Sequence, residues 1–198
     1  MNNFLAMTES RRSIYNLDKN LTISQDKIQE IVTHALKHTP SAFNSQSARV
    51  IILFDEKHDL LWDTTRDVLR DLTPEDSFAT TEQKIKGFRK AAGTILYFDD
   101  VSVTKSLQEN FPLYADNFPV WASQANGMLQ YHIWVALGNA GAGASLQHYN
   151  PIIDDAIKPK FRVPDNWSLV AQMPFGNPVD FPKEKEFVPI HERLLILE

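Results

Sequence analysis

The stretch Asn117–Ile153 contains no Asp, Glu, Lys or Arg, although 23% of the 198 residues are charged. Within it, Trp121–Gly138 is predicted to form a helix, because apolar residues spread at helical spacing over more than half of its circumference. A helix with so wide an apolar surface is expected to be buried in a core or a subunit interface. Its longest unbroken apolar run, Ile133–Leu137, is far shorter than the roughly 20 residues of a membrane span.

The composition predicts one globular domain that spans residues 1–198. Hydrophobic residues make up 43% of the chain, which is typical of a folded protein. The formal net charge of -5 and the lack of a Lys/Arg-rich run argue against nucleic acid or an anionic membrane as a partner. The sequence has no cysteine, which excludes disulfides, thiolate catalysis and cysteine-ligated metals. Met1–Tyr15 lacks an apolar signal core, so we expect a cytoplasmic protein.

Amphipathic and apolar patterns alternate along the chain and favour an α+β or α/β sandwich. Ser24 is the expected N-cap of the second helix, and Pro174–Pro178 is expected to stop the third strand. The predicted helices are Asn3–Arg12, Gln25–His38, Lys57–Leu72, Thr81–Ala91, Val101–Leu107, Trp121–Gly138 and Asp154–Lys160. The predicted strands are the apolar runs Ala48–Phe54, Ala92–Phe98 and Trp167–Met173, and the first two are expected to be buried.

Three segments are candidates for binding. Arg11–Ser13 could clamp an anion, because guanidinium and hydroxyl donors suit phosphate oxygens, or it could be an ordinary solvated basic pair. The amides and hydroxyls of Thr39–Ser47 could bind a heteroaromatic ring or could serve turn formation alone. The aromatic-rich segment Asn110–Trp121 could line a pocket or fill a core.

The common motifs of protein-borne catalysis are missing from the sequence. Gly141-Ala142-Gly143 half-matches a dinucleotide fingerprint, but it follows a predicted helix rather than a strand. His34 and His38 stand one helical turn apart without a third ligand nearby, so no metal site is predicted. No serine lies in a Gly-x-Ser-x-Gly elbow. If the protein is an enzyme, we expect a bound cofactor rather than a catalytic side chain to carry the chemistry.

Short motifs along nearly the whole chain resemble, in order and spacing, those of the nitroreductase family. Arg11–Ser13 resembles the family's FMN-phosphate motif, and Pro40–Gln46 resembles its Pro-Ser-x-x-Asn-x-Gln flavin loop. Gly141–Tyr149 matches the turn that the family places against the isoalloxazine, and Gln172–Pro178 matches a strand ending in Gly-x-Pro.

The resemblance is more specific to a fungal-type branch, which includes yeast and bacterial members linked to oxidative stress. The segments that carry it are Asn44–Arg49, Gly143–Pro151 and Ala171–Gly176. It implies an α+β fold with a central, mainly antiparallel sheet flanked by helices. It also implies an intertwined homodimer with two FMN sites at its interface.

The activity implied by the resemblance is FMN-dependent reduction of nitroaromatics, quinones or similar small acceptors by NADH or NADPH, with a role in the oxidative-stress response. The alternative is a non-enzymatic, flavin-binding regulatory protein of the same fold. A weaker third reading is an enzyme that consumes the flavin itself.

Site residues are carried over by matching motifs. Arg12 is expected at the ring carbonyl or the ribityl chain. The expected phosphate contacts are Arg11, Ser13, Lys183 and Lys185, with Arg193 as a competitor. The expected ribityl and ring contacts are Ser41, Phe43, Asn44 and Gln46. The residues expected at the edge of the flavin ring, with a backbone N–H near the flavin N5, are Ser145, Leu146, Gln147 and His148. The expected substrate wall is Phe111, Tyr114, Phe118 and Trp121.

Two positions depart from the family pattern. Tyr15 stands where many relatives have a basic residue that contacts the pyrimidine side of the flavin. Gln147-His148 replaces an acidic-Gly pair of the classical bacterial enzymes. The family's mode of nicotinamide stacking, and its choice between NADH and NADPH, therefore do not carry over to this chain.

Overall fold

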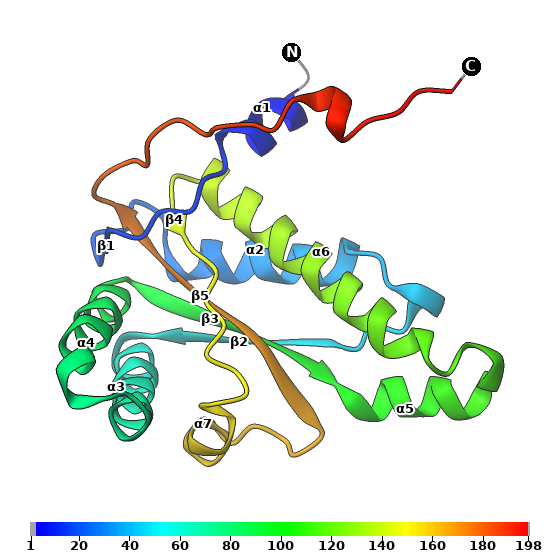
Figure 1. Cartoon of the computed structure of the whole chain (residues 1–198), viewed down its shortest axis with the longest axis horizontal. Coiled ribbons are helices and arrows are strands. Elements are labelled where there is room, and N and C mark those ends of the chain that lie inside the picture. Colours follow the sequence, from blue (N-terminus) through cyan, green and yellow to red (C-terminus); the bar gives the residue numbers. More distant parts are fainter. Residues whose placement is uncertain (1–2, 198) are drawn as a thin grey trace.

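An antiparallel sheet forms the centre of the computed structural model, which describes residues 3–197 (Figure 1). Among these residues it has five strands in the order β1-β5-β3-β2, with β4 paired to β5, and every pairing is antiparallel. The strands are β1 (Leu17–Asp18), β2 (Ala48–Phe54), β3 (Gly93–Asp100), β4 (Gly143–Ala144) and β5 (Trp167–Pro178). The expected α+β fold with a mainly antiparallel sheet is confirmed.

Helices cover both faces of the sheet, with α2 and α6 on one face and α3, α4 and α7 on the other (Figure 1). The α-helices are α1 (Asn3–Ser10), α2 (Gln25–His38), α3 (Asp55–Leu72), α4 (Glu75–Arg89), α5 (Val101–Asn110), α6 (Asn117–Asn139) and α7 (Asp154–Phe161). Short 3-10 turns are η1 (Ala42–Asn44), η2 (Pro112–Tyr114) and η3 (Ile190–Glu192). None of the helices in residues 3–197 is long and apolar enough to cross a membrane.

Two cores form because successive side chains of a strand point to opposite faces of the sheet. On β3, Ile95 and Tyr97 pack into the core beneath α2 and α6. Leu96 and Phe98 pack into the other core, together with Trp62 of α3. A near-continuous apolar strand is therefore buried on both sides, as the sequence of β3 predicts.

The structure corrects three of the predicted elements. β5 does not stop at Met173 but runs to Pro178, because β1 and β4 pair with its last residues. α4 begins at Glu75 rather than Thr81, and its first-turn acids Glu75 and Asp76 suit the positive end of a helix dipole. β2 pairs only with β3, and of its residues only Leu53 is buried.

The uncharged helix α6 is buried mainly on the face that meets the sheet. Its buried polar side chains are satisfied: Asn126 Nδ2 donates to Phe98 O at 3.0 Å, and Gln130 Nε2 donates to Asn126 Oδ1 at 2.7 Å. The opposite face exposes Met128 and Tyr131. Val135, on the same side as these two residues, is buried and lines a cavity together with Met7 of α1. The expected burial of the helix is therefore found on the face that meets the sheet, and part of the opposite face is exposed.

A buried histidine makes the stability of the fold depend on pH. Trp62 Nε1 donates to Thr94 Oγ1 at 2.9 Å, and the Thr94 hydroxyl lies 2.9 Å from His58 Nδ1. His58 Nε2 lies 3.2 Å from the Arg89 carbonyl, which can only accept, so the proton of the neutral ring belongs on Nε2. Burial, the main cause, lowers the pKa of His58 from 6.5 to about 4.

Because the unfolded chain binds this proton more readily, stability is present above pH 6.5 and falls as the pH drops towards 4. We expect His58 alone to remove about 2 kcal/mol from the free energy of unfolding between pH 7.5 and 5. Urea denaturation at pH 7.5 and at pH 5 measures this change in the free energy of unfolding. His58→Gln should lose most of this pH dependence, whereas His191→Gln, in the exposed tail, should keep it. An equal pH dependence in both variants would contradict the assignment.

Candidate functional site

Three cations gather where the segment after α1 meets the chain after β5. One terminal nitrogen of Arg12 donates to the Lys183 carbonyl at 2.6 Å. Loss of surrounding water, followed by the nearby charges of Arg11 and Arg12, lowers the pKa of Lys185. The three cations are thus Arg11, Arg12 and Lys185, and none of the ion pairs between described residues involves their side chains. A cation cluster without a carboxylate favours the binding of an anion.

Arg11 is held against a tryptophan of α6. Its guanidinium carbon lies 4.4 Å from the centre of the Trp134 ring, within the range of a cation–π contact. The Nε atom of Arg11 is buried and has no hydrogen-bond partner among the described residues. Because a buried, unpaired donor on a charged group is costly, this atom points to a missing acceptor.

The Ala144 carbonyl connects this cluster to the sheet. It accepts hydrogen bonds from Ile14 N at 3.0 Å and from Trp134 Nε1 at 3.1 Å. Ser13 forms a parallel bridge with Ala144, so the Arg11–Ser13 segment runs alongside β4. A cavity of about 270 Å³ lies here, lined by both arginines, Trp134 and the backbone of Gly141–Ala144.

The other predicted phosphate contacts lie farther along the tail. Lys183 enters the cluster through its backbone carbonyl, and its side chain is exposed. Arg193 follows η3 in the exposed end of the chain, and no described contact brings its side chain to Arg11. Of Lys183, Lys185 and Arg193, it is Lys185 that interacts electrostatically with both Arg11 and Arg12.

The ring-edge segment alternates between buried and accessible residues. Ser145 and Gln147 are buried, and Gln147 Nε2 donates to Ser145 Oγ at 3.1 Å. The backbone N–H groups of these two residues donate to the carbonyls of Pro174 and Gln172 on β5. The N–H groups of Leu146 and His148 take part in no hydrogen bond between described residues. The donors left for a ligand are therefore the backbone groups of Leu146 and His148.

The loop before β2 has an unusual backbone. Phe43, Asn44 and Gln46 have φ values of 56°, 51° and 49°, in the left-handed region that only glycine adopts readily. Each such residue costs about 1–2 kcal/mol, and clusters of this kind are typical of functional sites. Ser41 Oγ accepts from Gln46 N at 2.9 Å, and Gln46 Nε2 donates to Asn44 O at 3.3 Å.

The predicted aromatic wall assembles around the ring of Phe43. Its centre lies 4.9 Å from that of Phe111, 5.4 Å from Phe118 and 6.3 Å from Trp121. Tyr114 completes the group, 5.9 Å from Trp121. Phe118 is buried, whereas the rings of Phe43, Phe111 and Tyr114 are partly exposed. The cluster therefore combines a packed base with an accessible aromatic surface.

The cation cluster and the loop lie at opposite ends of α6 (Figure 1). The cavity beside the cluster is lined by Trp134 and Gly138, and the one beside the loop by Ala125 and Leu129. At 1.5 Å per residue, the centres of the two cavities are about 14 Å apart along the helix. One chain thus presents two separate candidate half-sites rather than one closed pocket.

Two residues that the sequence analysis did not assign to the site contact residues that it did assign. Trp134 supports Arg11, and Arg49 NH1 donates to the Gln46 carbonyl at 2.7 Å. Trp134 could have been noticed as the residue on the side of α6 away from its main apolar face, and Arg49 as the charge inside an apolar strand. Within residues 3–197, no group of His, Asp and Glu has a geometry that could hold a metal ion.

The strained backbone of the loop can be tested by replacing Gln46 with glycine. Gln46→Gly removes the Cβ that disfavours φ 49° and adds chain entropy to the unfolded state. We expect the free energy of unfolding in urea to stay equal or to rise by up to about 1 kcal/mol. Gln83→Gly, in exposed α4, should instead lose about 1 kcal/mol. A comparable loss in Gln46→Gly would show that its conformation stores no strain.

Known proteins share this fold and sequence. The model of the nitroreductase family matches residues 8–177. The Saccharomyces cerevisiae nitroreductase FRM2 is 34% identical over 189 residues, which cover 94% of this chain and 93% of FRM2. Lactococcus lactis nitroreductase CinD, solved with chloramphenicol, is 40% identical with a TM-score of 0.91 and covers 99% of this chain and 100% of its own. A Desulfovibrio desulfuricans protein solved with FMN shares the fold at 21% identity, with a TM-score of 0.70, covering all of this chain and 98% of its own. The chain belongs to the nitroreductase family.

Proposed function

We propose that the protein is an FMN-dependent oxidoreductase that uses NADH or NADPH to reduce nitroaromatics, quinones or similar small acceptors. The observation that carries this proposal is the buried Nε of Arg11, which has no partner among the described residues and lies within a cation cluster that forms no ion pair with a described carboxylate. A phosphate group supplies both the negative charge and the acceptor oxygens that this arrangement lacks.

The ligands of the relatives support this class of reaction. The Desulfovibrio desulfuricans protein was solved with FMN, and CinD was solved with chloramphenicol, with 4-nitrophenol and with nicotinic acid. The first two CinD ligands are nitroaromatic compounds, and nicotinic acid carries the pyridine ring that a nicotinamide also has. Acceptors and a nicotinamide co-substrate of the same chemistry are the natural candidates for this chain.

The phosphate of FMN would lie against Arg11, the Ser13 hydroxyl and Lys185. Arg12 has one terminal nitrogen committed to the Lys183 carbonyl, so its remaining donors face the ribityl chain or the ring. The backbone N–H groups of Leu146 and His148 would serve the ring edge, because those of Ser145 and Gln147 are used within the sheet. This set combines charge and fixed dipoles in the way that an anionic, reduced ring requires.

A second copy of the chain would bring its loop and aromatic wall to the same cofactor. The half-sites of one chain are about 14 Å apart along α6, and part of the outer face of that helix, at Met128 and Tyr131, is exposed. In the homodimer, Ser41, Phe43, Asn44 and Gln46 of one protomer would meet Arg11–Ser13 of its partner. Phe111, Tyr114, Phe118 and Trp121 would then form the wall against which a flat acceptor stacks.

FMN, when bound, supplies two-electron hydride transfer between a reduced nicotinamide and an acceptor. The protein contributes orientation and electrostatics, and no side-chain acid is required if solvent provides the protons. A cytoplasmic location and a role in the oxidative-stress response accompany this proposal as expectations from the family resemblance.

Removal of the Arg11 charge should weaken the retention of FMN. Loss of a hydrogen bond to a charged group corresponds to about 1.5–3 kcal/mol, which raises the Kd for FMN about 10- to 150-fold. Quenching of flavin fluorescence measures the Kd of wild type and of Arg11→Met. Arg66→Met is the matched control, since Arg66 pairs only with Asp63 and Asp67 on α3 and should bind FMN normally. An unchanged Kd in Arg11→Met would remove Arg11 from the site.

Enzymatic activity is tested separately from binding. We expect anaerobic stopped-flow mixing of the FMN-loaded protein with NADH or NADPH to bleach the flavin, and 4-nitrophenol or a quinone to restore its colour. Bound FMN that neither nicotinamide reduces would favour a non-enzymatic regulatory protein. Loss of FMN itself under oxygen would favour a flavin-consuming enzyme. A wild-type protein that binds no FMN would refute the proposal.

A further inference from the structure

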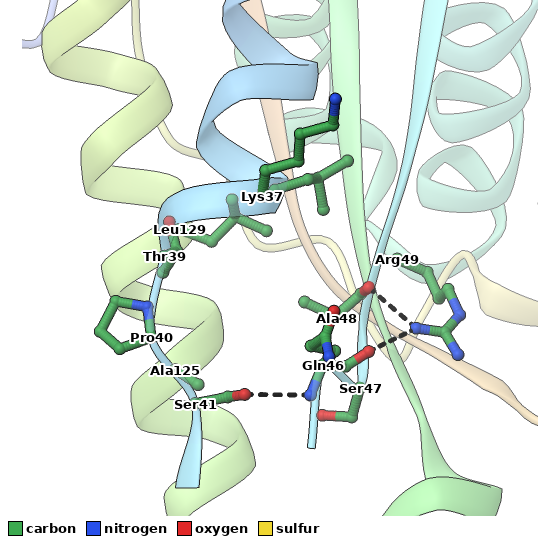
Figure 2. Close-up of a pocket in the computed structure, with 11 residues that line it drawn as sticks. Lys37, Thr39, Pro40, Ser41, Gln46, Ser47, Ala48, Arg49, Ala125 and Leu129 are labelled. Atoms are coloured by element: carbon green, nitrogen blue, oxygen red, sulfur yellow. Dashed lines mark hydrogen bonds between the residues drawn. The ribbon is translucent and has the colours of Figure 1, made fainter. Parts of the chain in front are cut away.

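Arg49 reaches the strained loop from β2. Figure 2 shows Ser41 and Gln46 facing each other at the pocket of about 280 Å³, with Arg49 on the other side of Gln46. Its NH1 atom donates to Gln46 O at 2.7 Å and to Ala48 O at 3.1 Å. The guanidinium therefore binds the loop's backbone rather than pointing into the pocket.

The other end of Arg49 is fixed by a rigid acceptor at the end of β3. Arg49 NH2 donates to Asp100 Oδ2 at 2.8 Å, and the Asp100 side chain is only 9% exposed. Asp100 Oδ1 accepts from Ser102 N at 3.1 Å and from Asn166 Nδ2 at 2.7 Å. Burial opposes ionisation, but these hydrogen bonds and the Arg49 charge outweigh it and lower the pKa of Asp100. The carboxylate is thus charged and immobile at neutral pH.

Hydrogen bonds fix both main-chain polar groups of Gln46, whose backbone is in the left-handed region. Its N–H donates to Ser41 Oγ, and its carbonyl accepts from Arg49. A conformation that costs about 1–2 kcal/mol persists only where its surroundings determine it. Gln46 is itself exposed, so packing around its side chain does not hold it. Its side chain adds one hydrogen bond within the loop, from Nε2 to Asn44 O, and of the three hydrogen bonds the one from Arg49 is the one that connects Gln46 to β2 and β3.

We infer that Arg49 is a positioning residue for flavin binding, which holds Gln46 and the Ser41–Gln46 loop in the ligand-ready conformation by linking the Gln46 carbonyl to Asp100. This inference rests on the proposed function, because it assigns the loop to FMN. Arg49 is among the residues that line the pocket, but the role inferred for its guanidinium is to hold the loop's backbone and requires no contact with the cofactor.

The opposing explanation is that Arg49 only neutralises a buried carboxylate. A buried charge that loses its partner destabilises the fold, and FMN affinity would then fall indirectly. Two variants separate these explanations. Arg49→Met removes both functions, whereas Arg49→Met combined with Asp100→Asn removes the unpaired charge but still leaves the Gln46 carbonyl without its donor. Arg66→Met is again the arginine control.

Two readouts are compared across these variants at a temperature well below every Tm. Amide hydrogen exchange of the peptide covering residues 41–47 is measured without FMN, and the Kd for FMN is measured by fluorescence. We expect at least about 10-fold faster exchange and about 10-fold weaker binding in Arg49→Met, with normal values in Arg66→Met. The combined Arg49→Met/Asp100→Asn variant should regain stability and keep both defects.

Recovery of loop exchange and FMN affinity in the combined variant would overturn the inference, because charge neutralisation alone would then explain Arg49. Wild-type exchange and affinity in Arg49→Met would overturn it as well. If wild type binds no FMN, the proposed function fails. The exchange data still decide whether Arg49 holds the loop, and unchanged exchange would refute that.

Discussion

The packing of α6 on one face of the sheet is the constraint on which both half-sites depend. Leu129, Ile133 and Leu137 are buried in the core shared with β3 and β5, which fixes the axis of the helix. At one end, Ala142 N donates to Leu137 O at 3.0 Å, and the chain turns directly into β4 and the Ala144 carbonyl. At the other end, Phe118 supports the ring of Phe43. This helix therefore sets both the position and the separation of the two proposed binding elements.

Local charge at the site opposes the charge of the whole molecule. The formal net charge is -5, yet Arg11, Arg12 and Lys185 lie together and form no ion pair among the described residues. Some of the acidic residues elsewhere form ion pairs: Asp59 and Asp63, for example, both lie within 3.3 Å of Arg89 nitrogens. Since screening confines the effect of exposed charges to about 10 Å, an anion near the cavity responds to the local cations more than to the distant acids.

Sequence periodicity and motif order predicted most helices and strands of the fold, because they reflect interactions between residues that are close in the chain. The Ser24 N-cap, which accepts from Lys27 N at 3.2 Å, and the β3 strand follow from such patterns. The extension of β5 to Pro178 depends on pairing with Leu17 and Gly143, which are far away in sequence. For the same reason motifs could name Arg11 and Gln46 but not Trp134 or Arg49, whose roles arise only when distant segments meet.

Exposed apolar side chains lie on α6, the helix that also carries both proposed half-sites. The outer face of α6 exposes Met128 and Tyr131, and the tail beyond Lys183, which passes α1 and leaves the body, exposes residues such as Leu194 and Leu195 (Figure 1). Apolar surface of this kind usually marks a contact with another molecule. A second copy that covered α6 would bring the strained loop of one protomer towards the cations of the other. The unpaired Nε of Arg11 is unfavourable in one chain, so a ligand that supplies its acceptor is stabilised by satisfying it, and a loop already held in its strained conformation costs the ligand little further ordering. In the proposed homodimer, cofactor binding and subunit association would therefore stabilise each other.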